Sequence, residues 1–194
     1  MTSTSPKQLL FGVLAALMTA TGAQAATYTW DAGGGGNTTW SEPTNWVGDV
    51  VPTFAATDTF DLTLTAGGTS TMSSNATLGI MNIGSSDGAV SWTLNRSGSE
   101  VLTLDNGGSA SQINTTLSSN AALPANTINV PIEIKGNLNI DNIAREKHLI
   151  FNNQISSSAT SGTQMITLTG NAGNGHAIYF NGGITDGSSG GKVA

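Results

Sequence analysis

Short runs of alternating apolar and polar residues are the feature of this chain that most limits its fold. Residues 101–104 read VLTL, and residues 138–140 read LNI. Alternation with a period of two places every second side chain on one face, as in a β-strand with one buried side. The other runs of this kind are 59–64, 78–80, 90–94, 128–130, 132–134, 149–151, 165–168 and 177–180. Beyond residue 25 only residues 143–147 look locally helical, so the pattern predicts an all-β chain.

The spacing of the runs bears on the architecture. Turn residues separate them, for example at Asp87–Gly88, Asn106–Gly108 and Asn181–Gly183. Very short strands that recur about every ten to twenty residues, with Asn, Thr and Ser at alternate positions, are typical of a right-handed parallel β-helix. The alternative is a β-sandwich, which requires antiparallel hairpins in two facing sheets.

A β-helix buries one strand residue in two inside its coils. With an assumed repeat of about 22 residues, this chain contains about seven coils. The polar residues between the buried ones are expected to face water and to stack from coil to coil. The residues predicted to line the core are Leu62, Leu64, Leu102, Leu104, Ile132, Ile134, Ile166, Leu168, Ile178 and Phe180.

The first 25 residues have the three parts of a secretory signal peptide. Lys7 is the only charged side chain before Asp31, and an apolar run spans Leu9–Met18. Ala23–Ala25 then form an A-x-A cleavage motif. This pattern predicts cleavage after Ala25 and a secreted, extracellular or cell-surface protein. The alternative is an uncleaved N-terminal anchor, although the apolar run is shorter than the roughly 20 residues of a membrane span.

Charge and cysteine content exclude several partners. Six basic residues stand against twelve acidic ones, and removal of Lys7 leaves five against twelve, a net charge of −7. Nucleic acids and anionic lipids attract clustered Lys and Arg, so we expect no nucleic-acid partner. We expect membrane contact only through an uncleaved signal peptide or through a missing C-terminal region. A missing region is expected because residues 190–194 contain no sequence that would cap a β-helix. With no cysteine, the exported protein has no disulfide.

The most distinctive segment is residues 28–52, which read YTWDAGGGGNTTWSEPTNWVGDVVP. Its pattern, W-D-(Gly/Asn run)-W-S-x-x-x-N-W-x-G-x-x-x-P, resembles the opening of the autotransporter-associated β-strand repeat proteins. Residues 128–193 also resemble this family, including ITLTG at 166–170, IYFNGGI at 178–184 and the GGKV ending. The resemblance implies an exported bacterial β-helix of the passenger type. A full copy of the family's G-x-G-x-L-x-L-x-G repeat, a translocating barrel and a sorting tail are not present in the sequence.

The chain therefore divides into a signal peptide (1–25), an aromatic N-terminal cap segment (26–56) and a β-helix repeat region (57–194) that is expected to be incomplete at its C-terminus. Two interpretations of Trp30, Trp40 and Trp46 remain open. As a lid, the rings bury apolar area over the first coil, and Gly33–Gly36 turn the chain so that Trp30 meets Trp40. As a platform, the flat rings stack on carbohydrate.

No residue pattern points to catalysis, a cofactor or a metal. Asp58 and Asp61 are three apart in a predicted strand, which places them on opposite faces. The acidic candidates are most simply solvated turn carboxylates: Asp58, Asp61, Asp105, Glu133, Asp141 and Asp186. His148 and His176 lack neighbours at metal-ligand spacing, and Arg145–Lys147 form a charged corner. Nucleophile, zinc and phosphate-loop motifs are missing.

We therefore expect a non-enzymatic exported structural or surface-display protein, adhesive towards cell-surface or matrix glycans or proteins. The alternatives are a carbohydrate-binding module that uses Trp30, Trp40 and Trp46, and a polysaccharide-cleaving β-helix enzyme.

Overall fold

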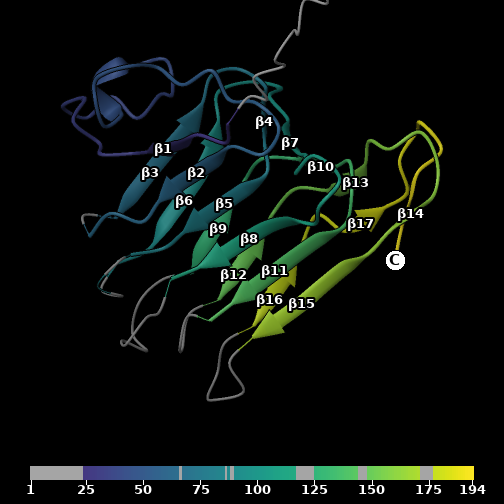
Figure 1. Cartoon of the computed structure of the whole chain (residues 1–194). Coiled ribbons are helices and arrows are strands. Elements are labelled where there is room, and N and C mark those ends of the chain that lie inside the picture. The colour runs from purple at the N-terminus through teal and green to yellow at the C-terminus, as the bar shows by residue number, and fades with distance from the viewer. Residues whose placement is uncertain are drawn as a thin grey trace, which may run out of the picture.

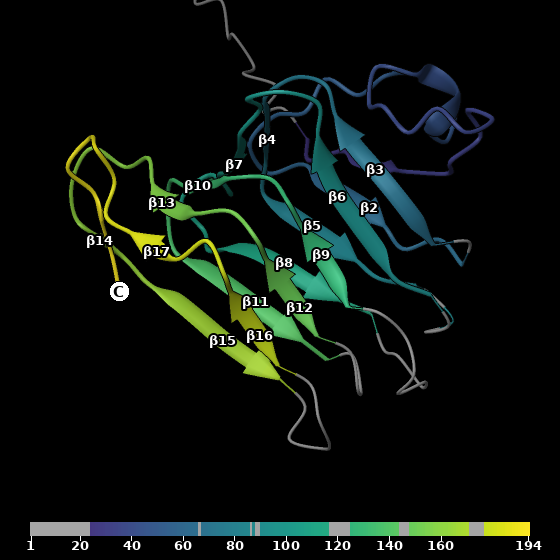
Figure 2. The ribbon, with the colours of Figure 1, turned by 180° about the vertical axis from the view of Figure 1, so that it is seen from behind.

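The protein is a parallel β-helix of about five turns. The computed structural model describes residues 24–65, 67–85, 87, 90–116, 125–143, 148–170 and 177–194. Three parallel sheets form the walls of the column, and each turn of the chain contributes one strand to each sheet (Figure 1). The strands of each sheet follow one another along the column in the view from behind as well (Figure 2). The prediction of an all-β solenoid is confirmed.

The sheets are named here in the order in which the chain visits them. Sheet 1 contains β1 (Thr27–Thr29), β2 (Thr59–Leu62), β5 (Ile80–Ile83), β8 (Ser111–Thr115), β11 (Leu138–Asn142) and β15 (Ile166–Gly170). Sheet 2 contains β3 (Gly68–Met72), β6 (Trp92–Arg96), β9 (Asn126–Ile128), β12 (Leu149–Phe151) and β16 (Ile178–Phe180). Sheet 3 contains β4 (Ala76–Leu78), β7 (Leu102–Leu104), β10 (Ile132–Ile134), β13 (Ile155–Ser157) and β17 (Ile184–Thr185).

Two smaller elements complete the described structure. A short pair, β14 (Thr163–Gln164) with β18 (Lys192–Val193), lies in the last part of the chain. A 3₁₀ turn, η1 (Pro43–Asn45), is the helical element of the described residues. Within that part of the chain, no helix has the length and apolarity needed to cross a membrane.

Strand direction decides between the two all-β architectures. Every pairing between the named strands is parallel, for example β2 with β5 and β10 with β13. A parallel partner cannot follow through a tight hairpin, so the chain reaches it only after passing through the other two sheets. The sandwich alternative, which requires antiparallel hairpins, is therefore wrong.

The expectation of 22-residue repeats in about seven coils is also wrong. Phe60, Met81, Ile113, Ile140 and Leu168 lie in register in sheet 1, which makes the successive coils 21, 32, 27 and 28 residues long. The strands stay short while the turns vary: one residue, Gly79, joins β4 to β5, whereas residues 105–110 join β7 to β8. Stacking constrains the strands and leaves turn length free, so no single repeat length exists.

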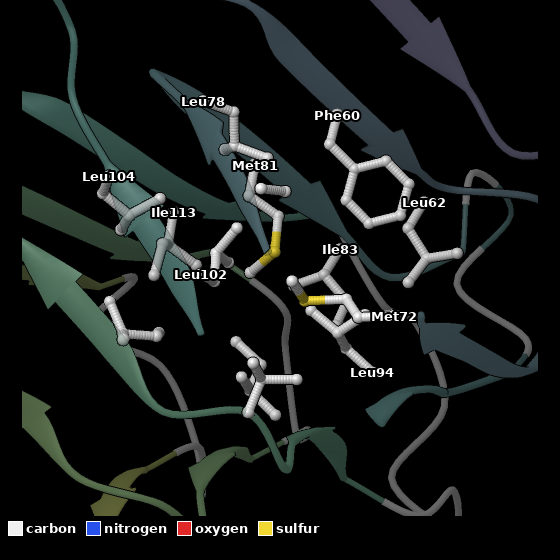
Figure 3. Close-up of a cluster of buried hydrophobic side chains, with 14 of the residues drawn as sticks. Phe60, Leu62, Met72, Leu78, Met81, Ile83, Leu94, Leu102, Leu104 and Ile113 are labelled. Carbon is white, nitrogen blue, oxygen red and sulfur yellow. The ribbon is translucent and has the colours of Figure 1, made fainter. Parts of the chain in front are cut away.

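The interior is a continuous apolar column. Inward side chains from the three sheets meet there, and Figure 3 shows several of them, including Phe60, Met81 and Leu104. Of the predicted core residues, Leu62, Leu102, Leu104, Ile132 and Ile134 are fully buried. This part of the prediction is confirmed.

Five predicted core residues are less buried than expected. Leu64 is half-buried where it follows β2. The other four lie in β15 and β16, in the last described layer, where inward side chains have a neighbouring coil on one side only. Leu168 is 50% exposed, and Ile166, Ile178 and Phe180 are half-buried.

An asparagine ladder runs along the outside of sheet 2. Asn129 donates its side-chain amide to Asn95 Oδ1 (2.7 Å), Asn152 donates to Asn129 Oδ1 (2.8 Å), and Asn181 donates to Asn152 Oδ1 (2.8 Å). Each amide can both donate and accept, so the row connects four successive coils. Stacked polar residues were expected at alternate positions, and this row confirms them.

The core column predicts the cost of removing one side chain from it. Leu104 is fully buried, and its register partners are Leu78 and Ile134. We expect Leu104→Ala to lower the free energy of unfolding by about 2–5 kcal/mol, because it leaves a cavity. The adjacent outward residue gives the control: Thr103→Ala should cost less than about 1 kcal/mol. Urea denaturation followed by circular dichroism measures both, and equal losses would contradict the assigned register.

The ladder predicts a difference between an interior and a terminal asparagine. Asn129→Ala removes two side-chain hydrogen bonds, whereas Asn181→Ala removes one. At about 0.5–1.5 kcal/mol for each bond, the interior variant should lose about twice as much unfolding free energy as the terminal one. Thermal and urea unfolding test this ratio, and identical midpoints for the two variants would show that the ladder adds no stability.

Candidate functional site

The aromatic cap segment (26–56) covers one end of the column. Its strand β1 pairs with β2, so sheet 1 gains one more layer. On sheet 2, Thr39 forms a bridge to Thr71, and the Trp40 amide donates to Thr71 O at 2.8 Å. Exposed strand edges template association with other chains, and these bonds occupy the first edges of sheets 1 and 2.

Aromatic rings fill the space between this segment and the first coil. Trp30, Trp40 and Trp46 are 0%, 3% and 1% exposed. Trp46 contacts Trp30 edge to face with ring centroids 5.0 Å apart, and it contacts Trp40 at 5.6 Å. Trp40 also packs edge to face on Phe60 of β2 at 4.8 Å. Edge-to-face packing adds stability beyond the buried area, so the rings join the cap to the core.

The indole nitrogens differ in their partners. Trp40 Nε1 donates to Ser70 Oγ at 2.7 Å, inside β3, and Trp46 Nε1 donates to Trp40 O at 2.9 Å. Trp30 Nε1 is buried and has no hydrogen-bond partner among the described residues. Two of the three indoles therefore help to position the cap through polar contacts as well as through apolar burial.

The glycine run forms the turn that returns the chain to Trp46. A Cβ on Gly33 would lie 2.4 Å from Thr44 O, and Gly35 has a φ of 62°, so this path requires glycine. The buried Asn45 amide accepts from Gly34 N at 3.0 Å and donates to Asn37 O at 2.8 Å. The turn was expected to bring Trp30 to Trp40. It instead places Trp30 beside Trp46, to which it is also bridged.

Two aspartates also make contacts within this segment. Asp31 Oδ1 accepts from Gly33 N at 3.1 Å. Asp49 has a φ of 55°, and its own amide donates to Trp46 O at 2.9 Å. The Asp31 side chain thus stabilises a turn of the cap, as Asp does elsewhere in proteins, whereas the contact of Asp49 is made by its backbone.

The buried position of the tryptophans bears on carbohydrate stacking. A sugar stacks on an open ring face, and the three rings have almost no exposed surface in this arrangement. Stacking on Trp30, Trp40 or Trp46 would therefore require the cap to open. The carbohydrate platform stays a prediction.

A groove of about 450 Å³ lies where the cap meets the start of sheet 3. Its two chain segments are residues 51–54 of the cap and residues 73–76, which lead into β4. Trp40, Ser41 and Trp46 also line it, and none of the lining side chains is charged. Sequence reasoning missed residues 73–76, because only the stacking of β4 beneath the cap brings them to Trp40.

The acidic candidates lie in different surroundings. Asp58 lies just before β2 and is 5% exposed, which corrects its prediction as a solvated turn residue. Asp61 lies on the outer face of β2 and accepts from Thr63 Oγ1 at 2.6 Å, so the prediction of opposite faces is confirmed. Glu133 and Asp141 lie within β10 and β11 rather than beside turns. Asp186 Oδ1 accepts from Val193 N at 3.0 Å.

One ion pair connects two coils. Lys135 Nζ lies 2.8 Å from Asp105 Oδ2. The hydrogen bond from Lys135 holds the pKa of Asp105 below its ordinary value, and the same bond raises the pKa of Lys135. These residues follow β7 and β10, which are neighbours in sheet 3. This pair is structural in position.

Of the two histidines, only His148 lies among the described residues. His148 Nδ1 accepts from Ala177 N at 3.1 Å, and its ring meets Tyr179 edge to face. His176 and Arg145–Lys147 lie outside the described residues. In the described ranges, no three His, Cys, Asp or Glu side chains come together as metal ligands would.

Comparison with protein-family models, curated protein sequences and solved structures finds no match for this chain. The resemblance to autotransporter-associated β-strand repeat proteins thus depends on residues 28–52 and 128–193 alone. What the structure establishes is the fold: a parallel β-helix of about five turns with an aromatic cluster near its N-terminus.

Proposed function

We propose that this protein is exported and serves as a structural element at the cell surface, in the manner of autotransporter-associated β-strand repeat proteins. The observation that carries the proposal is the unbroken parallel ladder of sheet 1 from β1 in the cap to β15. One apolar column accompanies it through all the coils. A stack of this kind holds its shape through main-chain bonds and burial, with no need for a disulfide or a metal.

Such a column suits display because its length follows from the number of coils. With strands about 4.8 Å apart, the four intervals from β2 to β15 span about 19 Å. Each further coil of a stack adds one such interval while the outer faces stay available. The protein is in this proposal a spacer without catalytic activity.

The outer faces supply neutral polar groups for adhesion. On sheet 2 the outward row contains Thr69, Thr93 and Thr127 in register, and the asparagine ladder runs beside it. Hydroxyl and amide groups both donate and accept hydrogen bonds. Cell-surface or matrix glycans and proteins are partners of matching chemistry, and the acidic net charge disfavours nucleic acid.

Export predicts a processed product. The full chain with a C-terminal epitope tag, expressed in a secreting bacterial host, should appear outside the cytoplasm without residues 1–25. Leu14→Arg places a charge in the apolar run, so that variant should accumulate as the uncleaved, tagged precursor. A matched change beyond the run, Thr27→Arg, should still be exported. Immunoblots of cell fractions and intact mass decide this, and equal export of both variants would contradict the signal peptide.

The groove favours a second candidate, a carbohydrate-binding module. Ser41, Thr53, Ser73, Ser74 and Asn75 contribute hydroxyl and amide groups to its lining, and apolar side chains contribute the rest. A site of polar groups on an apolar lining without charge matches an uncharged sugar. In this form the candidate uses the groove and does not need the buried faces of the tryptophans.

Filling the groove tests this candidate. A glycan array probed with the exported protein should show binding to neutral glycans, and Ser74→Trp should weaken it at least about tenfold without lowering the unfolding temperature. Val47→Trp is the control, since Val47 is exposed on the cap but does not line the groove. Trp30→Ala is expected to destabilise the fold by about 3–5 kcal/mol. If Trp30→Ala keeps the fold but abolishes glycan binding, the rings rather than the groove bind the sugar.

A further inference from the structure

Asp58 is a buried carboxylate with an unusual partner. Its Oδ1 accepts from Ala26 N at 2.8 Å, and its Oδ2 accepts from Ala55 N at 2.8 Å. The ion pair found in the described chain is Lys135 with Asp105, so no described Lys, Arg or His side chain pairs with Asp58. A buried charge is costly unless an opposite charge and hydrogen bonds compensate it. Two backbone amides supply the hydrogen bonds, and no charged side chain of the described residues supplies the opposite charge.

Ala26 is the residue at which the mature chain begins if the signal peptide is removed after Ala25. Gln24 and Ala25 are exposed, whereas Ala26 is half-buried. Ala26 O accepts from Thr59 N at 2.7 Å, next to the start of β1. The Ala25–Ala26 peptide bond thus joins an accessible residue to an anchored one. Its hydrolysis changes the chemistry beside Asp58.

The geometry points to a maturation-dependent ion pair between the new α-amino group of Ala26 and the Asp58 carboxylate. Hydrolysis breaks the Ala25–Ala26 peptide bond: water supplies a hydroxyl to the Ala25 carbonyl carbon, which becomes a carboxyl group, and a proton to the Ala26 nitrogen. The free amine takes a further proton at neutral pH and becomes an ammonium group. The 2.8 Å contact then joins an ammonium donor to a carboxylate in place of a neutral amide.

This change strengthens the attachment of the cap to the column. The hydrogen bond from the neutral Ala26 amide is already charge-assisted through its carboxylate acceptor. An ammonium donor adds the Coulomb attraction between opposite charges, which water screens little because Asp58 is 5% exposed. The pair holds Ala26 against the residue that precedes β2, at the place where β1 joins sheet 1. Cleavage therefore releases the leader and stabilises the cap over the first coil in one step. This inference rests on the proposed export in one respect: export brings the chain to the enzyme that cuts it after Ala25.

A thermodynamic cycle on the exported protein tests the pair. One variant carries a single Ser inserted between Ala25 and Ala26, so that processing leaves Ser at the N-terminus and returns the Ala26 nitrogen to an amide. With Asp58 present, the insertion should raise the unfolding equilibrium constant about tenfold, which is about 1.4 kcal/mol. In the Asp58→Asn background, the same insertion should change it less than about twofold. The substitution removes the carboxylate acceptor with either N-terminus, so its own cost cancels in the cycle.

Asp61→Asn is the matched control. Asp61 lies within β2, three residues beyond Asp58, and is aligned with Thr29, three residues beyond Ala26. The insertion should therefore retain its full effect in that background. An insertion effect of equal size in the wild-type and Asp58→Asn backgrounds would overturn the ion pair. If Asp58→Asn does not fold, a crystal structure of the exported wild-type protein decides. An Ala26 amine within about 3 Å of Asp58 supports the pair, and an amine directed to solvent overturns it.

Intact mass separates the two levels of the proposal. An exported product that begins at Ala26 supports the processing step. An exported product that begins elsewhere overturns this inference and leaves the exported function standing. A chain retained in the cytoplasm with all 194 residues overturns the proposed function, and the ion pair with it.

Discussion

The structure depends on one constraint, the parallel hydrogen-bond ladder between successive coils. Each strand of sheets 1, 2 and 3 finds its partner only after one full circuit of the chain, and the inward side chains keep register across the circuits. A slip of one residue would direct Met81 or Ile113 outward and bring polar neighbours into the column. Register and burial therefore enforce each other. Turns such as residues 105–110 can then vary in length without disturbing the stack.

The first coil of such a column has unpaired strand edges, and the aromatic cap segment covers those of sheets 1 and 2. It adds β1 to sheet 1, attaches Thr39 to sheet 2 and buries three indoles over Phe60. The cap leaves a groove beside the start of sheet 3. The groove and the Asp58 contact with Ala26 both lie where the cap meets the first coil, so the proposed glycan binding and the proposed ion pair concern the same end of the molecule.

Neutral polar side chains form the surface contacts here that charged side chains form on many other proteins. Charged residues make up 9% of the chain, and the asparagine ladder connects four coils through amides alone. An amide can donate to one neighbour and accept from another, so it repeats along a column in a way that a carboxylate cannot. A carboxylate beside another carboxylate in the next coil would be repelled.

The sequence by itself determined the strand character of the chain, favoured its solenoid class and identified five fully buried core residues, because a two-residue period follows directly from strand geometry. Those five are Leu62, Leu102, Leu104, Ile132 and Ile134. It also identified residues 28–52 as a separate aromatic segment. Only the tertiary structure decided the number of coils, the pairing of Trp30 with Trp46, the groove beside residues 73–76 and the burial of Asp58. These features depend on contacts between residues distant in sequence. Because the turns vary in length, the local sequence does not predict which distant residues meet. Asp58 shows the reason best: next to a turn it resembles any solvated carboxylate, until the fold brings Ala26 against it.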